Sequence, residues 1–349
     1  MERCLQLARL GAGTVAPNPM VGAVLLHDGI IIGEGYHMQY GQAHAEVNCI
    51  NSVLEQNRQF ISASSLYVSL EPCVHFGKTP PCADLIITNK IQKVVVGCSD
   101  QYHEVNGKGI AKLKAAGVQV TESVLEQSAR LLNKRFFTFH HQKRPYIILK
   151  WAQSSDGKIA HADFSSIPVS NDFSNRWVHK WRSEEAAIMV GTNTALYDNP
   201  SLTNRLWTGN HPIRVVIDKK LQLPLTHQLF SSVAKTIVFN NVKDEFTDSA
   251  QYCKLEENSN LLPQIMNVLF QQNIQSVLVE GGTKLLQSII DANLWDEARV
   301  ITNEQMIIGQ GIEAPILTNH RIYHTENLVN DRIQFYQPIF NSSTPNTSN

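Results

Sequence analysis

Four residues in the first half of the chain have the types and the spacing of a catalytic metal centre. His44 and Glu46 stand two positions apart in His-Ala-Glu, while Cys73 and Cys82 each follow a proline in the stretch EPCVHFGKTPPC. One imidazole and two thiolates give zinc three protein ligands and leave its fourth tetrahedral position open to water, as in catalytic zinc sites. Zinc lowers the pKa of that water toward about 7, and Glu46 would carry its proton to a leaving amine. The pattern therefore predicts hydrolytic deamination.

Two other interpretations of these residues stay open at this point. A His-x-Glu triplet is common, and two cysteines nine positions apart are more often buried apolar side chains than ligands. A structural zinc would need a fourth protein ligand, and His75, inside the cysteine loop, is the obvious candidate. The joint occurrence of His-Ala-Glu and two Pro-Cys pairs favours the catalytic centre over both.

The elements that must hold these residues alternate between strand and helix. Two apolar runs around Asp28-Gly29 predict a hairpin, because both turn residues can take positive φ. In chain order we expect a hairpin at 21–37, a helix at 45–56, a strand at 65–70, a helix at 82–90, a strand at 93–98, a helix near 107–116, a strand at 118–120 and a helical stretch at 123–139. Such alternation predicts a three-layer α/β unit.

The second half of the chain restarts with a strand and alternates again. We expect strands at 145–152, 186–191, 213–218, 236–240 and 276–280, with helices near 171–184 and 261–272 and a glycine turn that opens a helix at 281–294. We place the domain boundary in the polar stretch HHQKRP (140–145). This gives domains at 1–143 and 144–340 and a disordered tail at 341–349.

Composition and charge exclude several classes of protein. At 349 residues the chain is long enough for two domains, and its formal net charge of −1 offers no broad basic surface for nucleic acid. No apolar run approaches the roughly 18 residues of a membrane span, and the opening MERCLQLARLGAG lacks the apolar stretch of a signal peptide. We therefore expect a cytoplasmic protein with a small-molecule substrate. In that compartment a close cysteine pair indicates a metal site or a redox pair rather than a disulfide framework.

The motif of the first half resembles the zinc cytidine and nucleotide deaminases, in which H-x-E is followed by P-C-x-x-C. Here eight residues, rather than two, separate the two cysteines. That longer loop, together with PNPMVGAV (17–24), resembles the bifunctional deaminase/reductases of riboflavin biosynthesis. The resemblance implies a cytidine-deaminase-like three-layer α/β/α domain with His44, Cys73 and Cys82 as zinc ligands and Glu46 as the proton shuttle. By the same resemblance, the pyrimidine or its phosphate contacts Asn18, His75 and Lys78.

The stretches KWAQSSDGKIA (150–160) and VGTNTALYDNPSLTNR (190–205) resemble the reductase domain of the same family, which is dihydrofolate-reductase-like α/β and uses NADPH. No G-x-G-x-x-G follows a strand, so a Rossmann fold is not indicated. In LVEGGTKLL two glycines between a strand and a helix would let a phosphate approach the backbone. By resemblance the cofactor faces Ala152, Pro168, Thr194, Asp198 and Gly282. The substrate faces Lys150, Ser166, Arg182, Leu202, Arg205 and Glu280, and arginines suit a phosphorylated sugar.

Two positions depart from the family pattern. Pro168 stands where the family commonly has tryptophan, so an aromatic surface against the cofactor is lost at that position. Asn199 replaces an aspartate often found beside Asp198. Asp198 is a candidate proton donor for the reduction, although a loop aspartate after a helix is just as often a cap.

The resemblance implies two successive reactions in one chain. The first deaminates 2,5-diamino-6-ribosylamino-4(3H)-pyrimidinone 5′-phosphate. The second uses NADPH to reduce the ribosyl group to ribityl, which gives 5-amino-6-(5-phosphoribitylamino)uracil. The resemblance also implies a homodimer or higher homo-oligomer. A deaminase of another base with an inert second half, and a zinc-stabilised structural protein, are the alternatives.

Overall fold

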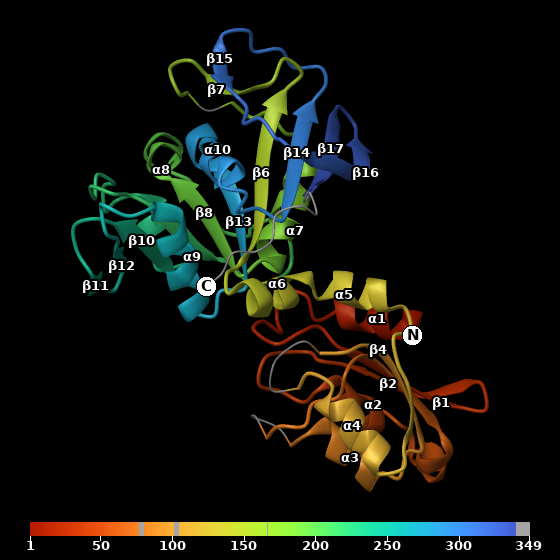
Figure 1. The fold of residues 1–349 in the computed structure, drawn as a ribbon. Helices are drawn as coiled ribbons and strands as arrows, with labels where there is room; N and C mark the ends of the chain where they lie inside the picture. The colour runs from red at the N-terminus through yellow and green to blue at the C-terminus, as the bar shows by residue number, and fades with distance from the viewer. Residues whose placement is uncertain (77–79, 101–104, 166, 340–349) are drawn as a thin grey trace. The chain divides into compact units, whose positions relative to one another are not determined.

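The computed structural model describes residues 1–76, 80–100, 105–165 and 167–339 of the chain. It divides into two compact units, Met1–Arg144 and Pro145–Asn349. Figure 1 shows the helices and strands of both units. Lys78, Ser166 and the tail predicted at 341–349 lie outside the described residues.

The first unit is built on a five-stranded sheet with the strand order β2-β1-β3-β4-β5. β1 (Gly22–His27) pairs antiparallel with β2 (Ile30–Tyr36) across the predicted Asp28-Gly29 turn, where both residues have positive φ. β3 (Ser65–Leu70) pairs antiparallel with β1 and parallel with β4 (Lys93–Cys98), and β4 pairs parallel with β5 (Gln119–Thr121). β3 and β4 therefore end at the same edge of the sheet, and the cysteine loop starts there.

Helices cover both faces of this sheet. α2 (Ala45–Asn51), α3 (Cys82–Thr88) and α4 (Lys108–Ala115) bury apolar side chains in one core with Ala23 and Leu25 of β1. α1 (Glu2–Arg9) packs instead on Val24, which points to the opposite face because side chains alternate along a strand. α5 (Glu126–Leu132) and α6 (Lys134–Gln142) share an apolar cluster with α1. The predicted three-layer arrangement of this unit is confirmed.

Two predicted helices of the first unit have different bounds. The helix expected at 45–56 ends at Asn51, and a 3-10 helix follows at Glu55–Ala63. The Ser52 hydroxyl donates to the Cys49 carbonyl at 2.7 Å and thereby competes with helix continuation. The helical stretch predicted at 123–139 is two helices that meet at Asn133. The Asn133 side chain accepts the N–H of Met20 at 2.8 Å and donates to the Met20 carbonyl at 2.9 Å. Local spacing cannot reveal such a long-range constraint.

The second unit contains, among the described residues, a ten-stranded sheet with the order β11-β12-β10-β9-β8-β13-β6-β14-β17-β16 and a separate pair, β15 and β7. The strands from β12 to β14 in that order run parallel, whereas β11, β17 and β16 are antiparallel to their neighbours. The strands are β6 (Tyr146–Ser154), β7 (Lys158–His161), β8 (Ala187–Gly191), β9 (Ile213–Ile217), β10 (Thr236–Asn240), β11 (Glu245–Phe246), β12 (Gln251–Lys254), β13 (Ser276–Gly281), β14 (Glu297–Asn303), β15 (Gly311–Glu313), β16 (His320–Leu328) and β17 (Asp331–Pro338).

Helices again cover both faces. α9 (Leu261–Gln271) and α10 (Thr283–Asp291) pack in one core with Met189 of β8. α7 (Asp172–Glu184) and α8 (Thr192–Asp198) pack in two clusters that contain the alternate strand residues Ile148 and Ile188. A 3-10 turn lies at Gln228–Phe230. Because β9, β8, β13 and β6 are parallel, their carboxyl ends meet at one edge of the sheet.

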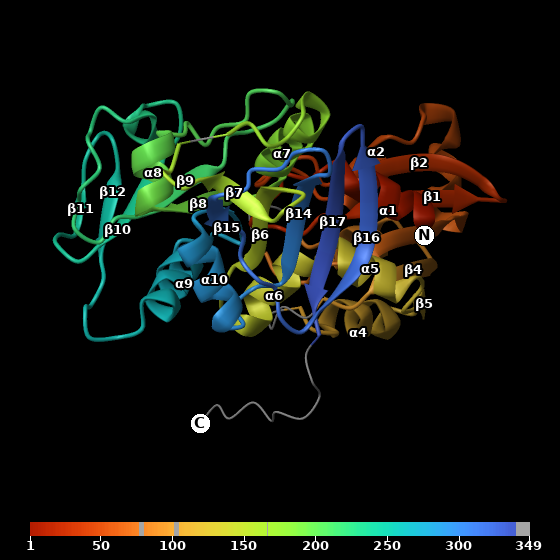
Figure 2. The same cartoon turned by 90° about the horizontal axis from the view of Figure 1, so that it is seen from above.

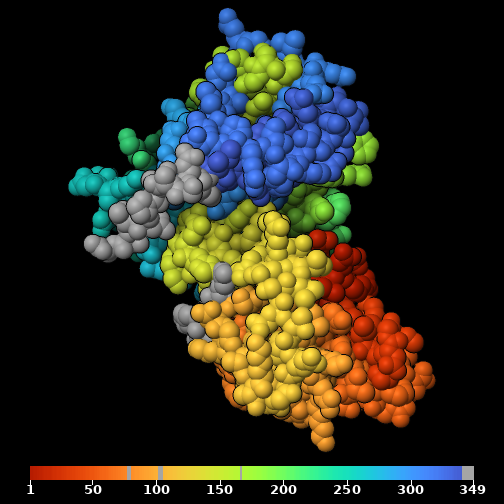
Figure 3. Space-filling view, turned by 45° about the vertical axis from the view of Figure 1, so that its right-hand side comes forward, coloured from red at the N-terminus to blue at the C-terminus, as the bar shows by residue number. Residues whose placement is uncertain are grey.

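The strands after residue 296 were not predicted. Figure 2 shows β14, β17 and β16 side by side at the end of the large sheet. β16 is mostly exposed, and its sequence HRIYHTENL has too few apolar residues to indicate a strand. In the space-filling view, the blue atoms of this C-terminal part form a continuous surface of the second unit (Figure 3).

Candidate functional site

The predicted metal ligands lie together in the first unit. The Nδ1 atom of His44 is 3.6 Å from Cys73 Sγ and 3.4 Å from Cys82 Sγ, and the three donor atoms all lie within 4.8 Å of one another. Zinc–sulfur and zinc–nitrogen bonds of about 2.3 and 2.0 Å at tetrahedral angles separate two such donors by about 3.6 Å. The donor set and its spacing therefore fit zinc.

Helix starts bring these ligands together. His44 directly precedes α2, and Cys82 is the first residue of α3. The N–H of Cys82 donates to Cys73 Sγ at 3.3 Å, and the N–H of Ala83 donates to the Cys73 carbonyl at 3.1 Å. These bonds fold the cysteine loop onto the first turn of α3, where free N–H groups favour a thiolate.

The two thiols share a proton unequally. A hydrogen bond from the Cys82 thiol lowers the pKa of Cys73 to about 4, and the same bond raises the pKa of Cys82 well above its ordinary value. Glu46 is buried in the first turn of α2, and burial raises the pKa of its carboxyl group. The Glu46 carboxyl also hydrogen-bonds with Cys82, so a group able to carry a proton lies directly beside the ligands.

The structure connects Asn18 to this cluster through a histidine that the sequence analysis did not select. The Asn18 Nδ2 atom lies 3.2 Å from Nε2 of His37, and the Nδ1 atom of His37 lies 3.0 Å from the Ala43 carbonyl. The His37 and His44 rings meet edge to face with centroids 5.3 Å apart. No sequence signal marked His37, because its proximity to His44 depends on the end of β2 meeting the start of α2.

The cysteine loop itself is described only in part. His75 and the following Phe76 are exposed. Lys78, the other predicted substrate contact of the loop, lies outside the described residues.

Glu71, two residues before Cys73, is a buried carboxylate that the sequence analysis also did not select. Its two oxygens accept four backbone N–H groups at 2.8 to 3.1 Å, those of Asp100, Gly107, Gly109 and Ile110. Two of these donors belong to the first turn of α4, whose N–H groups have no partner within the helix. Glu71 therefore ties the strand end that leads to Cys73 to the start of α4.

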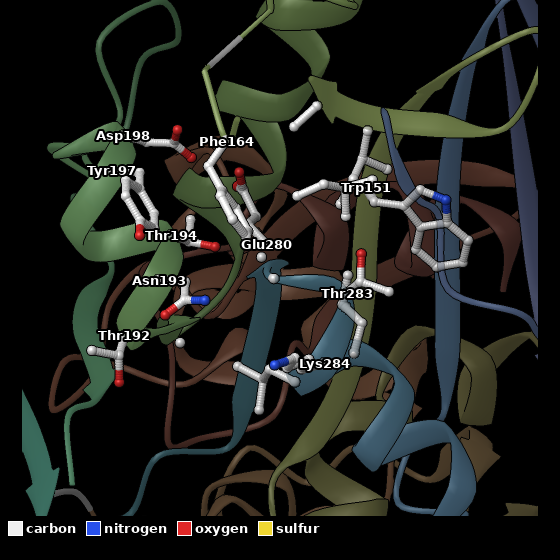
Figure 4. Close-up of a pocket in the computed structure, with 18 of the residues that line it drawn as sticks. Trp151, Phe164, Thr192, Asn193, Thr194, Tyr197, Asp198, Glu280, Thr283 and Lys284 are labelled. Atoms are coloured by element: carbon white, nitrogen blue, oxygen red, sulfur yellow. The ribbon is translucent and has the colours of Figure 1, made fainter. Parts of the chain in front are cut away.

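The second unit contains a cavity of about 830 Å³ at the carboxyl ends of its parallel strands. Figure 4 shows side chains from several strands and helices converging on it. Seven residues predicted to face cofactor or substrate line it, namely Lys150, Ala152, Pro168, Thr194, Asp198, Glu280 and Gly282. The fold thus collects into one cavity residues that are far apart in the sequence.

A buried ion cluster forms one wall of this cavity. Arg182 grips the Glu280 carboxylate with two hydrogen bonds of 2.7 Å, and Lys150 Nζ lies 3.7 Å from Glu280 Oε2. Burial opposes ionisation of Glu280, but the charges of Arg182 and Lys150 outweigh it and lower the pKa of Glu280 to about 2. Burial also lowers the pKa of Lys150. The carboxylate is therefore fixed and fully paired before any ligand arrives.

The predicted glycine turn lies directly against Thr194. Gly282 has a φ of 77°, and a Cβ there would lie 3.3 Å from Thr194 Oγ1. A Cβ at Gly281 would lie 2.8 Å from Thr194 Cγ2, so the threonine side chain would have to shift. The two glycines therefore let β13 and the start of α10 approach α8 closely.

Three predicted substrate residues are not among the described residues that line the cavity. Arg182 reaches it only through Glu280, and the Leu202 side chain is buried in an apolar cluster. The Arg205 guanidinium bonds the hydroxyls of Ser201 and Thr203, the latter at 3.1 Å. Ser166 lies outside the described residues.

A histidine missed by the sequence analysis lies against the backbone of Arg205. The N–H of Arg205 donates to Nδ1 of His179 at 2.8 Å. Burial, followed by the charges of Arg182 and Arg205, lowers the pKa of His179 to about 4. His179 is therefore neutral at physiological pH and can accept this bond.

The two residues that end α8 have different environments. Asp198 lines the cavity, and burial raises the pKa of its carboxyl group. Asn199 has a φ of 40°, and its Oδ1 accepts the N–H of Gln228 at 2.8 Å. The substitution of asparagine for the expected aspartate thus serves the turn after the helix.

In the part of the chain that the structure describes, no helix is long and apolar enough to cross a membrane.

Comparison with known proteins identifies both units. Residues 1–98 match the cytidine and deoxycytidylate deaminase zinc-binding region, and residues 145–326 match the RibD C-terminal domain. The riboflavin biosynthesis protein RibD of Aquifex aeolicus is 37% identical over 97% of each chain. That of Bacillus amyloliquefaciens is 39% identical over 85% of this chain and 81% of its own.

Solved structures agree with this comparison over nearly the whole chain. A diaminohydroxyphosphoribosylaminopyrimidine deaminase/5-amino-6-(5-phosphoribosylamino)uracil reductase from Thermotoga maritima matches with a TM-score of 0.89 and 35% identity, covering 97% of both chains. RibD of Acinetobacter baumannii matches with a TM-score of 0.86 and 29% identity, also over 97% of both chains.

These matches confirm the predicted fold class, a cytidine-deaminase-like N-terminal unit followed by a reductase unit. The zinc-binding region and the cluster of His44, Cys73 and Cys82 agree with Zn²⁺ as predicted, and the reductase unit agrees with NADPH. A deaminase with an inert second half and a purely structural zinc protein are both excluded. The chain belongs to the RibD family of riboflavin biosynthesis, whose members combine a deaminase and a reductase in one polypeptide.

Proposed function

We propose that the chain deaminates 2,5-diamino-6-ribosylamino-4(3H)-pyrimidinone 5′-phosphate and then reduces the ribosyl group of the product to ribityl with NADPH. The observation that carries this proposal is the cluster of His44, Cys73 and Cys82 beside the buried Glu46, together with a fixed ion cluster in the cavity of the second unit.

In the deamination, Glu46 moves the protons and the ligand triad holds the metal. Zinc bound by His44, Cys73 and Cys82 supplies the Lewis acidity that lets water ionise near neutral pH. Glu46 accepts the proton of the attacking water and delivers it to the departing amine, a role that a carboxyl group with a raised pKa suits. Burial of Glu46 provides that raised pKa.

Substrate binding in the first unit falls to Asn18 and the cysteine loop. Asn18 contacts His37, and His37 lies against His44, so the Asn18 amide is close enough to the ligands to bind the pyrimidine ring. We assign the phosphate to His75 and Lys78 by family resemblance.

In the reduction, the cavity of the second unit orients the open-chain sugar against the cofactor. NADPH supplies the hydride when bound, facing Ala152, Thr194, Asp198 and the turn at Gly282. Lys150 and Glu280 hold the sugar through their preformed ion pair, and Asp198, with its raised pKa, gives a proton to the developing alkoxide.

We assign the 5′-phosphate of the substrate to Arg205, which is not among the described lining residues of this cavity, rather than to Arg182. The Arg182 guanidinium already donates two hydrogen bonds to Glu280 and a third to the Thr203 carbonyl at 3.3 Å. Arg205 is exposed and bonds only neutral hydroxyls, so its charge is available for a phosphate. Leu202 and Ser166 contribute by resemblance alone.

We further propose that the deaminase occupies 1–143 and the reductase 144–340, close to the division between the two compact units. A cytoplasmic location suits the six cysteines, all of which are free of disulfides. A homodimer or higher homo-oligomer is proposed from family resemblance, and sedimentation equilibrium of the purified chain tests it, since a monomer at micromolar concentration would contradict it.

A single preparation tests the main proposal. The purified chain is expected to contain one zinc, to release ammonia from the diaminopyrimidine ribotide, and then to consume NADPH as the absorbance at the cofactor's wavelength falls. Full deamination by metal-free protein would contradict the assignment of the first site. Ammonia release without NADPH consumption would contradict the assignment of the second.

A further inference from the structure

Two stacked aromatic rings in the cavity of the second unit have no part in the roles proposed above. The ring centroids of Phe164 and Tyr197 are 4.9 Å apart, with 10° between the ring planes. Both residues line the cavity, with 41% and 55% of their surface exposed. Figure 4 shows the rings near Asp198 and Thr194. Large rings left open to a cavity offer a flat apolar surface to a planar ligand.

The backbone holds Phe164 in a conformation that bulky residues rarely adopt. Its φ is 66°, in the left-handed region. The N–H of Phe164 donates to the His161 carbonyl at 3.1 Å, and Asp163 Oδ1 accepts the N–H of Ser165 at 2.9 Å. This turn follows β7 and fixes the ring over the cavity. Strain of this kind concentrates at ligand-binding positions.

Tyr197 belongs to the same helix face as Thr194, a residue proposed to bind the cofactor. It stands three positions after Thr194 in α8, so the two side chains share a face of the helix. Thr194 contacts the glycine turn at Gly281 and Gly282, the proposed phosphate position. The stacked pair therefore adjoins the proposed cofactor path.

The pair also supplies what Pro168 lacks. The family resemblance implies a tryptophan at position 168, whereas Pro168 lines this cavity without an aromatic ring. Phe164 lies four residues earlier in the same segment. An aromatic surface absent from one position of the segment is present at another.

We propose that Phe164 and Tyr197 form the surface on which the nicotinamide ring of the bound dinucleotide stacks, in place of a tryptophan at position 168. The proposal rests on the placement of the cofactor in this cavity under the proposed function. Nicotinamide, rather than adenine, is the ring at this position, because hydride transfer requires it beside Asp198 and within reach of the sugar held at Glu280.

The test measures binding of NADPH and of 2′,5′-ADP, which lacks nicotinamide, to the zinc-loaded full chain by isothermal titration calorimetry. Tyr197→Ala and Phe164→Ala are each expected to raise the Kd of NADPH roughly 5- to 50-fold, since ring stacking is worth that much in comparable sites. The Kd of 2′,5′-ADP is expected to stay within about two-fold. Tyr197→Phe keeps the ring and is expected to restore NADPH binding to within about two-fold of the unaltered chain.

Controls separate binding from folding. Phe246→Ala removes a ring on β11 that is 76% exposed and is not among the described lining residues, and it is expected to change neither Kd. Phe164→Gly removes the ring but suits a φ of 66°, so its unfolding temperature is expected not to fall although NADPH binding weakens. A purely structural ring would instead show a lower unfolding temperature with NADPH binding intact, and that result would overturn the proposal.

The remaining outcomes also decide. Weaker 2′,5′-ADP binding in the alanine variants would put the adenine on the pair and overturn the nicotinamide assignment. A raised KM for the deaminated pyrimidine with an unchanged Kd of NADPH would make the pair a substrate surface and overturn the proposal too. If the unaltered chain binds neither NADPH nor 2′,5′-ADP, the proposed function of the cavity is wrong. If every variant binds NADPH as tightly as the unaltered chain does, the stacking proposal alone is wrong.

Discussion

Glu280 determines how charge is distributed in the reductase cavity. A lone buried carboxylate would be costly, but Arg182 and Lys150 surround it and keep it ionised. The arrangement leaves a neutral carboxylate–guanidinium pair facing the ligand with one additional ammonium group. A hydroxyl-rich sugar can bond to such a wall without displacing water from an isolated charge.

This pairing predicts a pH-dependent stability. The pKa of Glu280 is about 2 in the folded chain against an ordinary value of 4.5, so its contribution is complete above about pH 4.5 and is lost as the pH falls toward 2. Glu280→Gln leaves Arg182 buried without a counter-charge and is expected to cost about 3 kcal/mol of unfolding free energy at pH 7. The difference from the unaltered chain is expected to shrink by about 2 kcal/mol at pH 3.

Urea denaturation at the two pH values checks this prediction. Glu245→Gln, which removes a carboxylate from an exposed pair with Lys243, is the matched control and is expected to change stability by less than about 0.5 kcal/mol. An equal deficit for Glu280→Gln at pH 7 and pH 3 would show that the ion pair is not what stabilises the site.

Residue types and spacing were sufficient to predict the zinc ligands, because His44, Cys73 and Cys82 belong to short segments next to helix starts. The partners of Arg182 could not be predicted that way. Glu280 is 98 positions away, and only the register of β13 in the large sheet brings the two together. Local spacing likewise gave no signal for four other residues whose neighbours are set by the tertiary fold, namely His37, Glu71, Phe164 and Tyr197.

At the scale of elements, the start of α4 supports the metal centre through Glu71. The four N–H groups that Glu71 accepts come from segments on either side of residues outside the described ranges. Gly109 also lies directly against Pro72, and a Cβ there would be 2.0 Å from the Pro72 carbonyl oxygen. The backbone just before Cys73 is therefore held on two sides.

Glu71→Ala is expected to weaken both the fold and the zinc site. Four buried or half-buried N–H groups lose their acceptor, which costs about 3 kcal/mol or more of unfolding free energy. Since Cys73 is two residues away, zinc should leave the variant several-fold faster when a chelator is added, as followed by a colorimetric zinc indicator. Glu55→Ala, on an exposed side chain, is the control. Unchanged zinc release with a normal unfolding temperature would contradict this role.

The loop after β9 lies at another part of the same cavity. Lys219 and Lys220 line it, whereas Glu280 belongs to β13, two strands away in the sheet order. Under the proposed placement of nicotinamide near Glu280 and of the pyrophosphate at Gly282, the adenosine half of the cofactor would extend toward β9. Lys219 and Lys220 would then hold the 2′-phosphate that distinguishes NADPH from NADH.

The double substitution Lys219→Ala and Lys220→Ala is expected to lower the preference for NADPH over NADH by roughly ten-fold or more, because a charge-assisted bond to phosphate is lost. The ratio of kcat/KM for the two cofactors is the measurement, and Lys254→Ala, an exposed lysine on β12, is the control. An unchanged ratio would place the 2′-phosphate elsewhere.

Apolar runs bounded by turn residues predicted the central parallel strands, because those strands are buried on both faces. β14 escaped prediction since Glu297 and Arg299 interrupt its apolar pattern, and both are buried as an ion pair at 2.7 Å. β16 escaped because most of its side chains are exposed. Tertiary pairing, rather than local pattern, forms these strands.

At the scale of the whole molecule, two units with separate cores match a deaminase zinc-binding region and a RibD C-terminal domain. Under the proposed function they act in succession on one substrate. The zinc-binding region and the reductase unit recur together in relatives that match 97% of the chain. We propose above that the site at Glu46 performs the deamination and that the cavity of the second unit accepts the deaminated pyrimidine.

The most direct measurement uses Glu46→Gln in the coupled assay, since this variant keeps all three metal ligands. It is expected to retain zinc, to release ammonia at least about 100-fold more slowly, and to consume no NADPH when given the diaminopyrimidine ribotide. Given the already deaminated pyrimidine, it is expected to consume NADPH at the rate of the unaltered chain. Ammonia release at the unaltered rate, or loss of NADPH consumption with the deaminated pyrimidine, would contradict the account.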